Sequence, residues 1–348
     1  MSSTKALSAA GPDVPFVTAT IERRDLRADD VLIDIAYAGI CHSDIHQVKD
    51  EWGGSIYPMV PGHEIAGIVA GVGSGVTKYQ VGDRVGAGYM VDSCGQCEYC
   101  LVGVEQFCRT GHVLTYNCVG YDGVVNYGGY SQQIVIRESF ICRIPDTIEL
   151  SAAASLFCAG ITTYSPLRQW QVGSGRKIAV LGLGGLGHMG VKFAAAMGAE
   201  VTVLSRGTAK RERALSLGAK EFYDTSDPAT FTELRGRFDL MLNTVSGELP
   251  LGDYLESLWV GGVLVTVGLP ATPLSVPAEA LVNGNRVLAG SLVGGIAQTQ
   301  EMLDFCGEHG VVADVEVINA DQVDIAYARV LIGSVGHRFV IDTATIGR

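Results

Sequence analysis

The sequence predicts a two-domain α/β protein, in which a domain of short β-strands comes before a domain built on a doubly wound parallel sheet. The chain has 348 residues, enough for two domains of roughly 150 residues each. Short strand-like segments broken by Gly, Asp and Pro fill residues 31–144, a pattern typical of a compact all-β barrel. From residue 177 onward, apolar strand-like segments alternate with helical ones, which indicates a parallel sheet.

Four segments carry the strands expected in the first domain, and a helix is expected to follow them over residues 152–167. The strand segments are VLIDIAYAG, EIAGIVAGVG, GDRVGAGYM and YSQQIVI. In the second domain the strands KIAVL, VTVL, FDLMLNTV, GVLVTVGL and VLAGSLVG alternate with helices. Two helices after residue 295 and a last strand, HRFVID, could extend the second domain or return to the first, and the pattern alone does not decide between them.

The composition describes a folded, acidic protein. Hydrophobic residues make up 47% of the chain and charged residues 18%, which allows a sizeable core. The formal net charge of −12 argues against nucleic acid or an anionic membrane as a partner, because both attract basic surfaces. Residues 1–16 lack the apolar core of a signal peptide, and the apolar stretch 177–199 contains six glycines. We therefore expect a soluble, cytoplasmic protein that acts on a small molecule.

Four of the nine cysteines lie within fifteen residues, in the pattern C-x2-C-x2-C-x7-C. Such spacing lets tight turns aim the thiolates at one point, and four thiolates close a tetrahedral zinc site without an open position. An iron–sulfur cluster also uses four cysteines, and four unliganded thiols are a third alternative, although clustered exposed thiols oxidise readily. We favour a structural zinc, held by Cys94, Cys97, Cys100 and Cys108.

A glycine-rich turn follows the first strand of the second domain. The pattern G-x-G-x-x-G lies directly between the strand 177–181 and a helix, which is the context in which it binds the pyrophosphate of a dinucleotide. The first glycine permits the tight turn, the second lets the pyrophosphate approach, and the third packs the helix on the strand. The predicted turn comprises Gly182, Leu183, Gly184, Gly185, Leu186 and Gly187.

The end of the second strand favours a phosphorylated ribose. NAD-binding proteins usually carry an acidic side chain there, but this strand ends at Ser205 and Arg206, with Lys210 beyond and Glu200 at its opposite end. A carboxylate would repel a 2′-phosphate, whereas a hydroxyl and a guanidinium would bind it. The alternative is that these cations belong to the solvated first turn of a helix. We predict that the cofactor is NADP(H).

The stretch CHSDIH, which begins at Cys41, places a thiol, two imidazoles, a hydroxyl and a carboxylate side by side. Alone, it allows a metal ligand at Cys41, His42 or His46. His63 in PGHE and Cys158 in LFCAGITTYSPL are further candidates, and two thiolates with one imidazole leave a fourth zinc position open for catalysis. A buried thiol is more often an inert small hydrophobe, an interpretation that we keep for Cys118, Cys142 and Cys306.

With these motifs the chain resembles the zinc-dependent medium-chain alcohol dehydrogenases, specifically their NADP-dependent, cinnamyl alcohol dehydrogenase-like branch. The matching stretches span most of the chain in the expected order: AGICHSDIH, VPGHEIAGIV, GDRVG, CGQCEYC with the later FC, CAGITTYSPL, GLGGLGHMGVKFAAAMGA and RFVID. The resemblance implies a GroES-like β-barrel catalytic domain over residues 1–153 and 297–348. It implies a Rossmann NADP-binding domain over residues 154–296, so that the C-terminal segment returns to the first domain.

The resemblance also assigns two zinc ions, one structural and one catalytic. Cys41, His63 and Cys158 would hold the catalytic zinc, and Glu64 would approach the metal when its open position changes occupant. The four clustered cysteines would hold the structural zinc. His42 is left without a metal role.

Further residues receive roles from the same resemblance. Ser43 would hydrogen-bond the reacting substrate oxygen and pass its proton towards His46, while Asp44 would orient His63 as a carboxylate beyond the ligand. One departure from the family is that the basic residue expected after the second strand varies, and here the run is SRGTAK. Family positions that contact the cofactor match Ser43, Thr162, Thr244, Gly268, Ser291, Leu292 and Val293, with Arg338 as a pyrophosphate contact.

These features together predict an oxidoreductase that interconverts primary alcohols and aldehydes, both aromatic and aliphatic, with NADP(H). One alternative is an NAD-dependent simple alcohol or polyol dehydrogenase of the same superfamily. Another is a zinc- and dinucleotide-binding protein without catalysis, which we disfavour because the ligand and relay residues are all present. The resemblance implies a homodimer, for which the segment VLAGSLVGG offers an edge strand.

Overall fold

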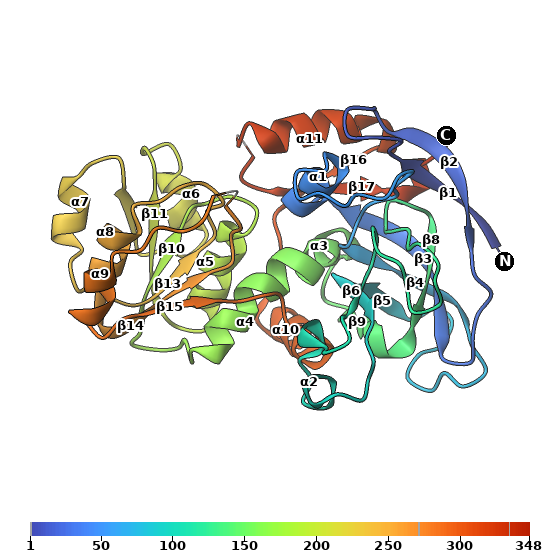
Figure 1. Ribbon diagram of the computed structural model, residues 1–348, viewed down its shortest axis with the longest axis horizontal. Coiled ribbons are helices and arrows are strands. Elements are labelled where there is room, and N and C mark those ends of the chain that lie inside the picture. Colours follow the sequence, from blue (N-terminus) through green and yellow to red (C-terminus); the bar gives the residue numbers. More distant parts are fainter. Residues whose placement is uncertain (1, 271, 334) are drawn as a thin grey trace. The chain divides into compact units, whose positions relative to one another are not determined.

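The computed structural model describes residues 2–270, 272–333 and 335–348 (Figure 1). The chain forms two units, a first unit of Met1–Ile161 with Gly294–Arg348 and a second unit of Thr162–Val293. The expected boundaries lay a few residues away, at 153/154 and 296/297. Residues up to Ile161 belong to the first unit because the Phe157 ring packs against Gly86 of β5 (Arg84–Ala87). A Cβ on Gly86 would lie 2.3 Å from that ring.

The first unit is built on a seven-stranded sheet whose order is β16-β17-β3-β4-β5-β9, with β8 also paired to β3. Its strands pair antiparallel except for β16 and β17, which are parallel. The four expected strand segments are all present in this sheet or next to it. The strands are β3 (Asp30–Gly39), β4 (Ile65–Val72), β5 (Arg84–Ala87), β8 (Gln133–Arg137), β9 (Cys142–Arg143), β16 (Val315–Ile318) and β17 (Arg338–Asp342).

Two small two-stranded sheets and five α-helices complete the first unit within the described residues, a sixth helix, α4, begins at Ile161, and the C-terminus lies beside the N-terminal hairpin (Figure 1). The sequence analysis did not predict that hairpin, β1 (Ser2–Ser8) with β2 (Val17–Arg23), although β2 alternates apolar and polar residues. The other elements are β6 (Met90–Asp92), β7 (Val113–Leu114), α1 (His42–Val48), α2 (Glu98–Leu101), α3 (Leu150–Ser155), α10 (Ile296–His309), α11 (Val323–Leu331) and α4 (Ile161–Gln169), which continues into the second unit.

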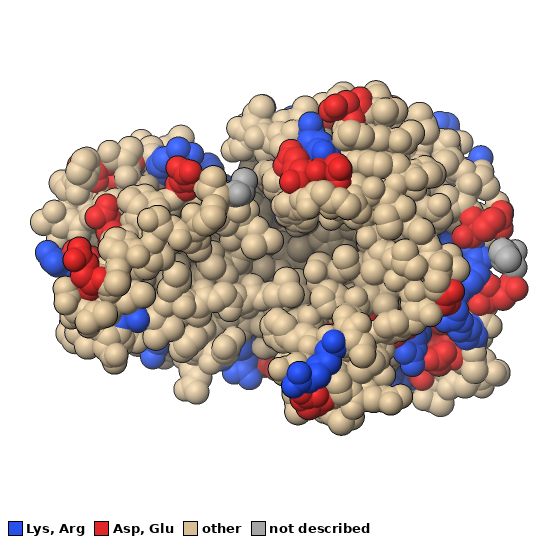
Figure 2. Space-filling model, in the orientation of Figure 1, with Lys and Arg blue, Asp and Glu red and all other residues tan. Residues whose placement is uncertain are grey.

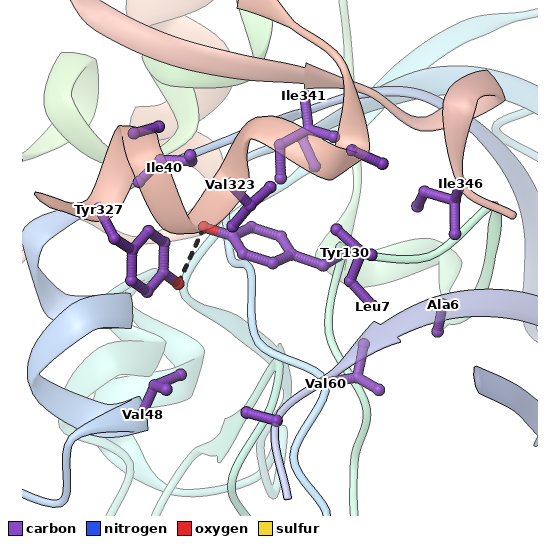
Figure 3. Packing of buried hydrophobic residues seen from close by; sticks show 14 of the residues in the cluster. Ala6, Leu7, Ile40, Val48, Val60, Tyr130, Val323, Tyr327, Ile341 and Ile346 are labelled. Atoms are coloured by element: carbon purple, nitrogen blue, oxygen red, sulfur yellow. Dashed lines mark hydrogen bonds between the residues drawn. The ribbon is translucent and has the colours of Figure 1, made fainter. Parts of the chain in front are cut away.

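The return of the C-terminal segment is explained by its packing. Strand β17 pairs antiparallel with the end of β3, where Val340 lies opposite Gly39. Helix α11 then buries its apolar face in a core cluster that also receives α1 and the N-terminal hairpin (Figure 3). Burying apolar area is the dominant favourable term of folding, so this shared core fixes the C-terminal segment in the first unit.

The second unit is a six-stranded parallel sheet of order β12-β11-β10-β13-β14-β15. Counted from the first strand of the unit, this is the order 3-2-1-4-5-6 of a doubly wound dinucleotide-binding sheet, which confirms the predicted fold class. Its elements are β10 (Lys177–Leu181), α5 (Gly187–Ala196), β11 (Glu200–Ser205), α6 (Arg211–Ser216), β12 (Glu221–Asp224), α7 (Ala229–Glu233), β13 (Phe238–Asn243), α8 (Leu251–Glu256), β14 (Leu258–Thr266), α9 (Ala278–Val282) and β15 (Val287–Gly290).

Among the described residues, no helix is both long enough and apolar enough to cross a lipid bilayer. The continuous apolar strands of the second unit are buried instead, because helices are wound onto both faces of a parallel sheet. Ile178, Val180 and Leu242 illustrate this, since none of the three has any exposed surface.

Candidate active site and cofactor site

Cys41, His63 and Cys158 come together in the first unit from three separate elements. Cys41 is the N-cap of α1, His63 lies in the loop before β4, and Cys158 lies in the π-helical turn Leu156–Gly160. With Glu64 they form a buried group in which one ligand atom from each residue lies within 4.8 Å of every other. A π-helical turn between two α-helical segments is a frequent mark of a functional site, and here it carries one of the converging thiols.

The distances in this group fit a tetrahedral zinc ion. The Sγ atoms of Cys41 and Cys158 are 3.7 Å apart, and two thiolates bound tetrahedrally at the usual zinc–sulfur distance would be about 3.8 Å apart. The contact lowers the pKa of Cys41 and raises that of Cys158, so one thiol of the pair ionises first. Because a metal would displace both protons, these residues are suited to hold zinc.

Asp44 orients the imidazole of this group. Its Oδ1 lies 2.9 Å from Nδ1 of His63, which leaves Nε2 free for a metal. Its Oδ2 accepts a 2.9 Å hydrogen bond from the backbone N–H of Cys41, so one carboxylate braces two predicted ligands. Burial disfavours the charged form of His63, but Asp44 and Cys41 together outweigh burial and raise the His63 pKa. The predicted orienting role of Asp44 therefore rests on a direct contact.

Glu64 and Arg338 form a fully buried ion pair beside the thiols. Only Oε1 of Glu64 takes part, and its buried Oε2 has no hydrogen-bond partner among the described residues. Burial raises the pKa of Glu64 to about 7, although Arg338 acts in the opposite direction. Glu64 belongs to the same group of candidate ligands as Cys41. Its unpartnered Oε2 could therefore bind a metal held there. The Arg338 guanidinium, expected at a pyrophosphate, is paired with this carboxylate.

Ser43 and His46 lie on the first turns of α1. Ser43 is partly exposed, and the His46 Nδ1–H donates a hydrogen bond to the Glu51 carboxylate. On one side His46 stacks on the exposed His42, with ring centroids 4.8 Å apart. On its other side, the His46 ring packs near Trp52, with ring centroids 4.9 Å apart. His42 is not part of the candidate metal group and packs on the residue predicted to carry the proton.

The second cysteine group is compact and local. Cys94, Cys97, Cys100 and Cys108 have their Sγ atoms within 4.8 Å of one another. All nine cysteines are free thiols, so none of these four is consumed by a disulfide. Backbone N–H groups point at the sulfurs, including those of Cys97 to the Cys94 Sγ and of Cys94 to the Cys108 Sγ. These hydrogen bonds stabilise thiolates, and four thiolates suit a closed structural zinc site.

The glycine-rich turn has the geometry that its spacing predicts. Gly182 has φ +83°, and a Cβ on Gly187 would lie 2.2 Å from the Gly182 carbonyl oxygen. A side chain at Gly184 would meet nothing within 4 Å, so the backbone there is open to a ligand. Helix α5 begins at Gly187, and the positive end of its dipole favours an anion.

Three cations crowd together after the end of β11. Burial and the neighbouring charges of Arg213 and Arg206 lower the pKa of Lys210. Figure 2 shows Lys and Arg side chains gathered near α6, with an acidic side chain beside them. Glu200 lies at the opposite end of the strand, where Lys220 pairs with it. Mutually repelling cations with a strand-end hydroxyl at Ser205 suit a phosphate dianion.

The remaining predicted cofactor residues are all in the second unit except Ser43. Thr244 donates a 2.7 Å hydrogen bond to the Leu181 carbonyl at the end of β10, next to the glycine turn. Gly268 packs tightly against the Val245 backbone, where a Cβ would be 2.4 Å from the carbonyl oxygen. Val293 has φ +37°, a costly backbone conformation for a β-branched residue. Thr162 is buried, and Ser291 and Leu292 follow β15.

Sequence analysis missed three residues near the site. Tyr116 stacks on His63, with ring centroids 6.0 Å apart, and the hydroxyls of Tyr130 and Tyr327 lead to Asp44. No motif marks these tyrosines in the sequence, and an aromatic residue is most often plain core. No spacing signal links residues so far apart in the chain.

Two family models match the chain. The model described as the alcohol dehydrogenase GroES-like domain matches residues 27–146, and the one described as zinc-binding dehydrogenase matches residues 185–308. The first match contains Cys41 and His63 together with the four clustered cysteines, and the second contains most of the predicted cofactor residues.

Individual proteins resemble the chain along nearly its whole length. A probable formaldehyde dehydrogenase, AdhA, of Bacillus subtilis is 60% identical over 99% of this chain and 98% of its own. An NADP-dependent alcohol dehydrogenase C of Mycobacterium bovis is 56% identical over 99% of this chain and all of its own. A solved cinnamyl alcohol dehydrogenase of Sorghum bicolor is 43% identical, with a TM-score of 0.96 over 99% of this chain and 98% of its own.

The fold, the convergent thiols and imidazole, and these similarities agree with one another. The chain belongs to the zinc-dependent medium-chain alcohol dehydrogenases, a family of oxidoreductases, and within it to the cinnamyl alcohol dehydrogenase-like branch.

Proposed function

We propose that this chain reduces aldehydes to primary alcohols, and catalyses the reverse oxidation, with NADP(H) as the hydride carrier. The observation that carries the proposal is the buried group of Cys41, His63 and Cys158 in one unit. Two thiols and one imidazole at this spacing leave one tetrahedral position for a substrate oxygen. The relatives named as alcohol and formaldehyde dehydrogenases support the same substrate class.

The bound zinc would supply Lewis-acid polarisation of the substrate oxygen, and the nicotinamide would supply or accept the hydride. The residues of the chain then manage the proton. Ser43 hydrogen-bonds the substrate oxygen, and His46 exchanges the proton with solvent as a general acid and base. Glu51 holds the His46 ring through Nδ1. Asp44 keeps the His63 ring in the orientation that presents Nε2 to the metal.

The cations after β11 support a preference for NADP(H) over NAD(H). Arg206 and Lys210 would pair with the 2′-phosphate, and binding would relieve the repulsion that lowers the Lys210 pKa. The relative named as NADP-dependent favours the same choice. Because cells usually keep NADP largely reduced, we propose aldehyde reduction as the working direction.

The test is a panel of aromatic and aliphatic aldehydes assayed with NADPH and with NADH, with zinc content measured on the same preparation. We expect two zinc ions per chain and a higher kcat/KM with NADPH. A kcat/KM more than about tenfold higher with NADH would refute the cofactor assignment and favour an NAD-dependent dehydrogenase. Full activity without zinc would refute the catalytic metal.

We also propose a homodimer joined through the second unit. Strand β15 is the last strand in the sheet order, paired with β14 alone within the described part of the chain, and an open edge invites pairing with another chain. Trp259 and Val260 at the start of β14 are more than half exposed. Sedimentation at micromolar concentration should give a dimer, and a monomer would contradict the proposal. The nine free thiols suit a reducing compartment such as the cytoplasm.

A further inference from the structure

We propose that Tyr130 and Tyr327 are positioning residues for the catalytic zinc site, acting in series through Asp44. The two hydroxyls form a chain that ends on the carboxylate that orients His63. The inference rests on the proposed zinc ligation by Cys41, His63 and Cys158. It assigns a role to two tyrosines that touch neither a candidate ligand atom nor the proposed substrate position.

The direction of each hydrogen bond in this chain follows from the carboxylate. Oδ2 of Asp44 can only accept, so the Tyr130 hydroxyl, 3.4 Å away, donates its single proton to it. The oxygen of Tyr130 is then left to accept, and the Tyr327 hydroxyl lies 3.3 Å from it (Figure 3). The hydrogen-bond route from Tyr327 to Asp44 therefore runs through the Tyr130 hydroxyl.

The partners of Asp44 leave its negative charge available to His63. Asp44 has no exposed surface, and among the described residues its ion pair is with His63. A lysine or arginine there would neutralise the carboxylate and weaken its pull on the His63 Nδ1–H. Hydroxyl and backbone N–H donors instead stabilise the buried anion without cancelling its charge, and a more strongly polarised imidazole is a better zinc ligand.

The surrounding packing keeps water from replacing these hydroxyls. Tyr130 is fully buried and Tyr327 is 6% exposed, and Phe16 covers Tyr327 edge-on with ring centroids 5.3 Å apart. Gly62, directly before His63, makes room for the Tyr130 ring. A Cβ on Gly62 would lie 2.5 Å from that ring, and the φ of Gly62, +105°, also favours glycine. The residue next to a predicted ligand thus admits the ring that reaches Asp44.

The length of these contacts sets the size of the expected effect. Both hydroxyl distances exceed the 2.9 Å of the Asp44–His63 contact, so each bond is weaker. Loss of a direct partner of a ligating histidine typically costs about 10–100-fold in metal affinity. For Tyr130→Phe we expect about three- to tenfold faster loss of the catalytic zinc to a chelator, a smaller effect because the residue is one step further away.

The experiment measures zinc release from both sites in the full-length protein carrying Tyr130→Phe, Tyr327→Phe or both. The matched control is Tyr79→Phe, which removes a partly buried hydroxyl that donates to the Ile141 carbonyl in the same unit. Tyr130→Phe should speed release from the catalytic site and leave the four-cysteine site unchanged. Tyr327→Phe should give about a twofold effect, and the double variant should behave like Tyr130→Phe. The cobalt-substituted Tyr130→Phe protein should show shifted visible absorption bands.

Four results would overturn the inference. Tyr130→Phe could release the catalytic zinc at the same rate as the control Tyr79→Phe. It could also speed zinc release from both sites equally and lower the Tm, which would indicate a purely structural role. The effects of the two single variants could instead multiply in the double variant, which would show that Tyr327 does not act through Tyr130. If Tyr130→Phe fails to fold, a Tyr327→Phe protein that releases the catalytic zinc at the wild-type rate would contradict the proposed series of hydrogen bonds.

The proposed function can fail separately in the same measurement. A wild-type protein that binds zinc only at the four-cysteine site would overturn the catalytic metal, and this inference with it. A wild-type protein with two zinc ions and tyrosine variants that behave like the control would overturn the inference alone.

Discussion

The Sγ atoms of Cys41 and Cys158 lie 3.7 Å apart, although 117 positions separate the two residues in the chain. One thiol sits at the N-cap of a short helix and the other in a π-helical turn. Their approach depends on the packing of residues 150–161 against the sheet of the first unit, including the Phe157 ring on Gly86. The metal site is therefore a property of the folded first unit, and the following predictions test its parts.

Cys158→Ala should reduce the zinc content from two ions per chain to one, because two remaining protein ligands do not hold a catalytic zinc well. We expect aldehyde reduction to fall by at least about a hundredfold, since a metal Lewis acid contributes several kcal/mol to catalysis. Elemental analysis and steady-state kinetics measure both effects. Cys118→Ala, whose thiol lies outside both metal groups, is the control and should keep two zinc ions. Two zinc ions in Cys158→Ala would contradict the ligand assignment.

Cys100→Ser should remove the zinc of the four-cysteine site, because a structural site needs all four thiolates. The binding energy of such a zinc contributes to folding, so a lower Tm and greater sensitivity to protease near residues 94–108 are expected. Differential scanning calorimetry and limited proteolysis follow these changes. The freshly purified variant should still carry the catalytic zinc. An unchanged Tm together with one lost zinc would show that this site does not stabilise the fold.

Lys210→Ala should raise the KM for NADPH by about ten- to a hundredfold, because a hydrogen bond to a charged group contributes about 1.5–3 kcal/mol. The KM for NADH should change little, since NADH lacks the 2′-phosphate. Lys220→Ala is a matched control, as Lys220 pairs with Glu200 at the opposite end of the same strand. If Lys210→Ala raised the KM for NADPH and for NADH equally, the cations after β11 would not recognise the 2′-phosphate.

Arg338→Leu should lower the free energy of unfolding by about 3–5 kcal/mol, because it leaves the fully buried Glu64 carboxylate without its cation. The double variant Arg338→Leu with Glu64→Leu should recover part of this loss, since no buried charge then remains. Urea unfolding of the three proteins measures the difference. Equal losses in the single and double variants would mean that the ion pair is not the source of the destabilisation.

Local patterns were sufficient to predict much of the fold and one of the two metal groups. Short apolar segments bounded by Gly, Asp and Pro marked β3 and β4, and the glycine spacing marked the turn before α5. Close cysteine spacing marked the four-cysteine group, because ligands that are near in sequence are near in space. Each of these signals is carried by residues within about one supersecondary unit.

Long-range relationships could not be predicted from the chain alone. Cys158 was assigned by family resemblance, since nothing near it in the sequence indicates that it meets Cys41. The pairing of Arg338 with Glu64 and the chain from Tyr327 to Asp44 depend on the return of the C-terminal segment. The N-terminal hairpin was missed although its second strand, VTATIER, alternates apolar and polar residues, so a local strand signal was present there.

The pairing of β17 with β3 separates the order of synthesis from the order of folding. The second unit is one uninterrupted segment, Thr162–Val293, so it can fold as soon as that segment leaves the ribosome, because domains generally fold as units during synthesis. The first unit begins earlier but lacks the strand opposite Gly39 until Val340 has been made. Until then the edge of β3 at residues 37–39 stays unpaired, and unpaired edges invite association. The unit that emerges first is therefore the one that folds last, and it is the more exposed of the two to aggregation on the ribosome.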